Sequence, residues 1–224
     1  MIDNLCTHSS YSRKLMLESS MMYDKNAIEN TYSVMKEFYE VIKNDENKNV
    51  VQSLQFKLCN LKDINHTISR LATSVVIDDI ELYEVKSLAL LSADVKNILE
   101  KISLDKIIEI PNLDDVVKIL DPDGLRIATF YIYDSYSEEL ASLRKKLKEK
   151  DVYQEEIYNE VMRIEDEIRD ELSSKLKPYS EAMTSALNAL ADVDINIAKS
   201  LQMKELGLCF PTISLDNISS YKGI

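Results

Sequence analysis

The stretch Leu187-Asn-Ala-Leu-Ala-Asp-Val-Asp-Ile-Asn-Ile-Ala-Lys-Ser-Leu201 decides the fold of this 224-residue chain. At about 100° per residue, its apolar residues gather on one face of a helix: Leu187, Leu190, Ala191, Ile197, Ala198 and Leu201. Asp194 falls in the middle of that face. A buried carboxylate needs a partner, so either Asp194 pairs within the core or this face meets something that the pattern does not reveal.

The partner of Asp194 is not fixed by the pattern. Basic residues are scarce near the other expected core helices, and Arg13 and Arg70 are the candidates. We expect a salt bridge, a contact with backbone amides or a kink that faces solvent, because burial without a partner raises the pKa of a carboxyl group.

The composition indicates an all-α protein. The chain has 3 Gly and 4 Pro, too few for the tight turns that sheets and barrels require, while 45% of its residues are hydrophobic. Its 27 basic and 39 acidic residues give a net charge of −12, which repels nucleic-acid phosphates unless the cations are segregated. No apolar run is long enough to span a membrane and the start does not resemble a signal peptide, so we expect a cytoplasmic chain without a membrane partner.

Apolar residues at helical spacing predict a succession of helices. The expected segments are 9–43 with a new start at Asp24, 50–58, 61–71, a helix capped by Asp78 that runs to about 99, and a short helix opened by Asp114. The sequence Asp121-Pro-Asp-Gly124 predicts a tight turn. The residues 127–133 that follow are β-branched and aromatic, so at most one small β-hairpin is expected near 117–133.

An antiparallel helical hairpin is predicted over 135–177, with its turn near 150–152 and its first helix capped by Ser135 or Ser137. The outgoing arm is basic and the return arm is acidic, so folding one on the other would place opposite charges side by side. Pro178 should interrupt the return arm, and Gly207 should end the last helix. The cations of the outgoing arm either pair in this way or contact a DNA backbone: Arg144, Lys145, Lys146, Lys148 and Lys150.

No catalytic, cofactor or metal site can be nominated from the sequence. With 3 Gly in the chain no phosphate-binding loop exists, and His8 and His66 belong to no cluster with metal-ligand spacing. The three cysteines, Cys6, Cys59 and Cys209, fit reduced thiols and are expected to be small core residues.

Several segments resemble, in order, the core and lever region of the MutS family of DNA mismatch-repair ATPases. Ala186–Lys199 followed by Phe210-Pro211 looks like the returning lever helix, and Cys6–Leu15 looks like the opening core helix. Asp24–Met35 resembles the next helix, and Leu61–Leu71 is similar to the segment where the core helices cross. The likeness extends over nearly the whole chain, although its motifs are apolar and degenerate.

The resemblance implies a helical core over residues 1–134 and 178–210, a hairpin arm over 135–177, and from 211–224 the start of a linker to an ATPase domain beyond the chain. It implies a protein without catalysis of its own, which couples that ATPase to DNA or partner binding. For the full-length protein it implies ATP, Mg²⁺, DNA and a homodimer. The mismatch-reading and connector domains are missing, and a short hairpin replaces the larger clamp.

A rival interpretation is a stand-alone helical module for protein–protein interaction. It is motivated by the net charge of −12 and by the heptad-like spacing of Ile157, Val161, Ile164, Ile168 and Leu172 on the return arm.

Overall fold

The computed structural model of the chain describes residues 5–148 and 154–213, and within these ranges every regular element is helical. The α-helices are α1 (Ser10–Glu18), α2 (Lys25–Lys43), α3 (Lys48–Leu58), α4 (Asn65–Ala72), α5 (Asp79–Lys101), α6 (Asp114–Leu120), α7 (Glu138–Leu147), α8 (Gln154–Leu176) and α9 (Ser180–Leu206). Short 3₁₀ turns at Asp45–Asn47, Asp134–Tyr136 and Lys177–Tyr179 precede α3, α7 and α9. The predicted all-α class is confirmed.

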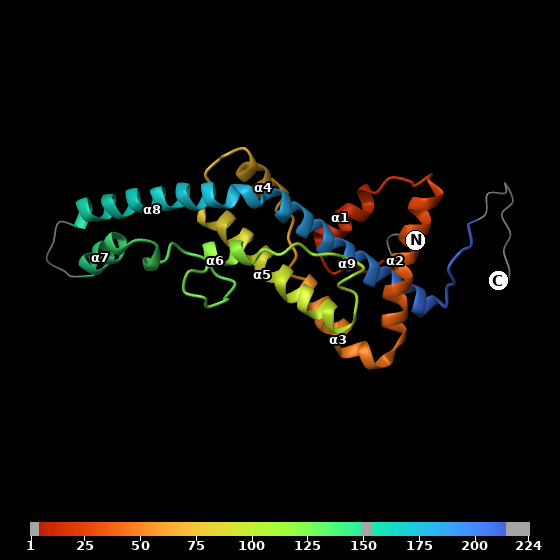
Figure 1. The fold of residues 1–224 in the computed structure, drawn as a ribbon. Coiled ribbons are helices and arrows are strands. Elements are labelled where there is room, and N and C mark those ends of the chain that lie inside the picture. The colour runs from red at the N-terminus through yellow and green to blue at the C-terminus, as the bar shows by residue number, and fades with distance from the viewer. Residues whose placement is uncertain (1–4, 149–153, 214–224) are drawn as a thin grey trace.

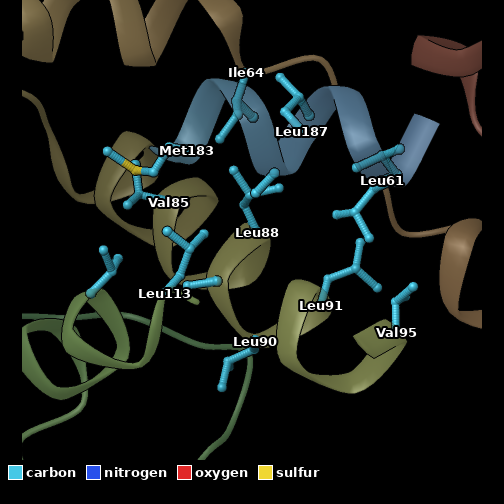
Figure 2. Close-up of a cluster of buried hydrophobic side chains, with 14 of the residues drawn as sticks. Leu61, Ile64, Val85, Leu88, Leu90, Leu91, Val95, Leu113, Met183 and Leu187 are labelled. Carbon is cyan, nitrogen blue, oxygen red and sulfur yellow. The ribbon is translucent and has the colours of Figure 1, made fainter. Parts of the chain in front are cut away.

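Helix α9 runs through the core and packs against α1, α2, α3, α4 and α5 (Figure 1). Its apolar residues recur so closely that a broad face of the helix is buried, while a narrower stripe through Ser185, Asn188 and Asp192 is exposed. Figure 2 shows Met183 and Leu187 of α9 facing Val85 and Leu88 of α5, with Ile64 closing the cluster from the segment before α4. These side chains are almost completely buried, so the hydrophobic effect holds α9 and α5 together.

The ends of the helices follow local capping chemistry. The Asp24 carboxylate accepts the amide of Ala27 at 2.8 Å and starts α2. Asp78 and Glu81 form a reciprocal capping box at the start of α5, which satisfies two amides that the helix itself cannot pair. Ser137 caps α7, and Gly207 ends α9 with φ of 62°, a left-handed conformation that suits glycine.

Helices α7 and α8 form the predicted antiparallel hairpin, which projects from the core as an arm (Figure 1). Its seam is apolar and buried, with Leu140 on α7 and Val161, Ile164 and Ile168 on α8. The inner part of α8 also packs against α4 and α6. The predicted turn at 150–152 lies outside the described residues, as do residues 214–224 of the expected linker.

Pro178 interrupts the return path as predicted. It lies in the 3₁₀ turn Lys177–Tyr179, between the end of α8 and the start of α9. A proline removes one backbone donor and clashes with the preceding turn, so a regular α-helix cannot pass through this position undisturbed. Helices α8 and α9 nevertheless lie end to end along the length of the molecule (Figure 1).

Two sequence-based expectations differ from the structure. The segment 127–133 forms no strand among the described residues, because Phe130, Tyr131, Tyr133 and Tyr136 pack their rings on one another instead of on a paired strand. The turn before it is present, since the Gly124 amide donates to the Asp121 carbonyl at 2.9 Å. The three cysteines are exposed rather than in the core, because each lies beside a helix end or in a connecting segment.

Truncation of Leu187, which is fully buried, should destabilise the fold. We expect Leu187→Ala to lower the free energy of unfolding by about 2–5 kcal/mol, because it leaves a cavity between α9 and α5. Leu206→Ala, at a position on the same helix that is 59% exposed, is the matched control and should change stability by less than about 0.5 kcal/mol. Urea denaturation of both variants measures the difference, and equal effects would contradict the role of α9 as the centre of the core.

Candidate functional site

The carboxylate of Asp194 is fully buried and binds the backbone that leads into α1. The amide of His8 donates to both carboxylate oxygens at 3.0 Å, and the amide of Ser9 donates to Oδ2 at 2.9 Å. The His8 ring nitrogen Nδ1 lies 3.0 Å from Oδ1. Residues 186 positions apart in the sequence are therefore joined at one point.

The start of α1 is built to present these amides. Ser9 is the N-cap of α1, and its hydroxyl accepts the amide of Ser12 at 2.9 Å. The backbone is extended at Ser9, so the amides of His8 and Ser9 lie outside α1 and donate to Asp194 on α9. A carboxylate at this position also benefits from the partial positive charge at the amino end of α1. The arrangement fixes α1 against α9 in position and direction.

The pKa of Asp194 is set by two opposing effects. Burial alone would raise the pKa, because it disfavours the charged carboxylate. The hydrogen bonds from the His8 ring and from the His8 and Ser9 amides outweigh that penalty, and the pKa lies below its ordinary value. Asp194 is therefore ionised in the folded protein at neutral pH.

The predicted burial of Asp194 is confirmed, and among the expected partners the backbone amides are correct. The two arginines are wrong. Arg70 instead donates to Glu81 at 2.6 Å and to the Val76 carbonyl at 3.1 Å, which ties α4 to the start of α5. Arg13 is exposed and has no ion pair within the described part of the chain. The signal that could have found the true partner is the N-cap Ser9, since amides before a capped helix are free to bind an anion.

A second buried polar cluster, which the sequence reasoning missed, lies where the arm meets the core. The ammonium of Lys86 on α5 donates to Asp121 at 3.0 Å and to the Tyr133 hydroxyl at 2.9 Å, and the side chains of Lys86 and Asp121 are both fully buried. The amide of Arg126 donates to the other oxygen of Asp121 at 2.6 Å. Burial would raise the pKa of Asp121, but these bonds outweigh it and lower the pKa. The available signal was a lysine in the middle of the apolar stripe of α5.

This cluster anchors the base of the arm. Tyr133 immediately precedes the 3₁₀ turn that leads into α7, and the Tyr136 hydroxyl donates to the Ile119 carbonyl at 2.8 Å. Arg144 of α7 continues the attachment, because it donates to the Ile132 carbonyl at 2.7 Å and to Glu165 of α8 at 2.8 Å. Arg144 therefore has a structural role and is not available to a phosphate.

The remaining cations of the arm are placed differently from the predicted charge pairing. Lys145, Lys146 and Lys148 are exposed, and none of them forms an ion pair with a residue that the structure describes. Among the described residues, the ion pair between α7 and α8 is that of Arg144 with Glu165. Lys150 lies outside the described residues. The structure thus leaves three neighbouring ammonium groups of α7 open to solvent.

The described residues contain no group of three or more His, Cys, Asp or Glu side chains that could hold a metal ion. None of the helices in the same ranges is long and apolar enough to cross a bilayer. Comparison of the sequence with models of known protein families and with curated proteins found no match. The site is therefore characterised by its own geometry: a buried carboxylate that locks α1 to α9, and an arm anchored by Lys86 and Arg144.

Replacement of Asp194 by asparagine should weaken the contact between α1 and α9. The asparagine side chain has an NH₂ group where the amides of His8 and Ser9 require an acceptor. We expect Asp194→Asn to lower the free energy of unfolding at pH 7 by about 3 kcal/mol. Because the folded pKa is lowered, the contribution of Asp194 is fully present above its unfolded pKa of about 3.9 and is lost as the pH falls through the folded value.

Urea denaturation at pH 7 and at pH 3 measures both effects. The difference between wild type and Asp194→Asn should be smaller at pH 3. Glu205→Gln, at an exposed position near the end of the same helix, is the control and should have little effect. A difference that grows on acidification would contradict the assignment.

The Lys86 cluster should respond as a coupled pair. Either Lys86→Met or Asp121→Asn leaves the other group buried without its counter-charge, and each should cost about 3–5 kcal/mol. The double variant removes both charges, keeps an acceptor for the Arg126 amide and should cost less than the sum of the two single changes. A double-mutant cycle by urea denaturation tests this, and simple additivity would show that the two groups do not interact.

Proposed function

We propose that this chain is the helical core and lever of a MutS-related ATPase, a structural and allosteric module without catalysis of its own. The observation that carries the proposal is the contact between Asp194 and the amides of His8 and Ser9. Asp194 belongs to the segment that resembles the lever helix, and His8 and Ser9 belong to the segment that resembles the opening core helix. The two most informative parts of the resemblance therefore meet through the one acid that appeared out of place.

The helix arrangement suits the transmission of movement. Asp194 holds α9 against α1. The amino-terminal end of α9 is joined through the turn at Pro178 to α8, which forms part of the arm. At its other end, Phe210 lies against the rings of Tyr32 and Tyr39 of α2, with centroid distances of 6.3 and 5.8 Å. A domain attached after Pro211 would act on both α9 and α2. In this proposal that domain binds ATP and Mg²⁺, and the full-length protein is a homodimer.

The arm is the proposed contact with DNA. Lys145, Lys146 and Lys148 are exposed on α7 and lack counter-charges among the described residues, so their charge is available to phosphates. The net charge of −12 makes binding by this chain alone weak, because the rest of the surface repels the same backbone. The arm contributes contacts that depend on the full-length dimer for affinity.

One observation favours a second candidate function, a stand-alone module for protein–protein interaction. The outer face of α8 exposes more acids than bases over several turns: Glu155, Glu156, Asp166, Glu167, Asp170 and Glu171. Asp166, Glu167 and Glu171 pair with bases of the same helix. Such a face repels DNA and attracts a basic protein surface. The two candidates differ in what binds to the arm, and binding assays separate them.

The proposed function is tested with the protein that the complete gene encodes and with the 224-residue chain alone. The longer protein should hydrolyse ATP and bind branched or mismatched duplexes in a manner that depends on ATP and Mg²⁺, whereas the chain alone should not hydrolyse ATP. ATP hydrolysis by the purified chain would overturn the proposal. A complete gene without an ATPase domain would favour the interaction module.

Neutralising the exposed lysines of α7 separates a role in DNA binding from a structural role. We expect the triple variant Lys145→Gln, Lys146→Gln, Lys148→Gln to melt like the wild type, because these side chains make no ion pair with the described residues. DNA binding by the full-length protein should weaken, and the slope of log K against log salt should fall by about 1 for each phosphate that is no longer neutralised. Unchanged DNA affinity and salt dependence would exclude this face of the arm.

A further inference from the structure

A groove of about 620 Å³ lies on the opposite side of the core from the arm, between α1, α2, α9 and the segment 107–109. Its walls are mainly apolar and are formed by Leu15, Met16, Val34, Ile107 and Ile108. The floor is different in character, because α9 contributes mostly polar residues there. The groove is separate from the Asp194 contact and from the Lys86 cluster.

The floor residues of α9 have the spacing of a coiled-coil seam. Ser185, Asn188, Asp192, Ile195 and Lys199 all line the groove and follow one another at intervals of three, four, three and four. This is the spacing with which one helix contacts a second helix that runs along it. Asn188 already accepts a hydrogen bond from the Tyr11 hydroxyl at 2.7 Å. Asp192 and Lys199 remain as the charged positions of the seam.

Asp192 and Lys199 attract one another electrostatically. Within the described ranges, neither side chain forms a hydrogen bond or a close ion pair. The Asp192 side chain is accessible to solvent, yet the surrounding walls raise its pKa, and the same crowding lowers the pKa of Lys199. Both groups would be stabilised in their charged forms by an opposite charge placed in the groove.

We propose that this groove binds an amphipathic helix of a partner protein, which lies along α9 with an apolar stripe against α1 and α2. Asp192 and Lys199 are seven residues apart, which is two helical turns or about 10.5 Å. A helix alongside α9 has the same rise, so a base and an acid seven residues apart on its inner face would meet both groups at once. That charge complementarity identifies the occupant as a helix with one basic and one acidic seam residue.

The rim of the groove supports an extended partner. Met22 lines the groove, and the adjoining connection between α1 and α2 exposes Met21 and Tyr23 by 76% and 87%. Methionine side chains are flexible and polarisable, and they adapt to the apolar face of a bound helix. The floor of the groove is long enough for about four turns of helix, since Ser185 and Lys199 are about 21 Å apart along α9.

Two synthetic amphipathic peptides of about 18 residues test the proposal. Both carry leucine at seam spacing, with one lysine and one glutamate seven residues apart, and they differ in which charge comes first, so that parallel and antiparallel docking are both covered. We expect one peptide to bind the 224-residue chain at least tenfold more tightly than a version with both charges replaced by glutamine. Asp192→Asn and Lys199→Gln should each weaken binding about tenfold, as for a contact of about 1.4 kcal/mol.

The matched controls are Asp115→Asn and Lys118→Gln, an exposed acid and base paired at 2.8 Å on α6, which should leave peptide binding unchanged. Circular dichroism of each variant verifies that it is folded. Failure of both peptides to bind at millimolar concentration overturns the proposal, as does binding that Asp192→Asn and Lys199→Gln leave unaltered. Sedimentation of the protein alone adds one outcome: a dimer abolished by Asp192→Asn would assign the groove to a second copy of the chain and overturn the partner helix.

Discussion

One face of helix α9 is buried along most of its length, and a polar side chain on that face has no water to solvate it. Asp194 is charged in that environment only because two backbone amides and the His8 ring surround its carboxylate. The contact has a direction as well as an energy, since amides before a capped helix accept an anion from one side. The orientation of α1 on α9 depends on this contact, whereas α2 packs on α9 directly.

The arm depends on the core in a comparable way. Lys86 and Asp121 neutralise one another in a site that excludes water, and Tyr133 extends their hydrogen bonds to the segment that leads into α7. A buried pair of this kind contributes little net stability compared with an apolar core, but it allows one geometry and disfavours others. The Asp194 contact and the Lys86 cluster are thus both found where separate elements meet.

Sequence patterns predicted most of the helices, because apolar spacing and caps such as Asp24, Asp78 and Ser137 act locally. They also predicted that Asp194 is buried. The N-cap Ser9 indicates where amides are free to bind an anion, but it does not show that these amides reach Asp194, which is 185 positions away in the sequence. The position of Lys86 among apolar residues of α5 was a signal of burial, but its partners Asp121 and Tyr133 are 35 and 47 positions away and no spacing rule connects them. The β-branched run 127–133 was misjudged because β propensity reflects packing, and here aromatic rings supplied the packing.

The distance in sequence between Asp194 and His8 has a consequence for biosynthesis. Helices α1 and α2 make their main contacts with α9, which is translated nearly last among the described elements. At about 5–20 residues per second, the amino-terminal helices are synthesised roughly ten seconds or more before α9. During that interval their apolar faces are exposed to the ribosome surface and to chaperones. The amino-terminal helices can therefore complete their packing only after α9 has been synthesised.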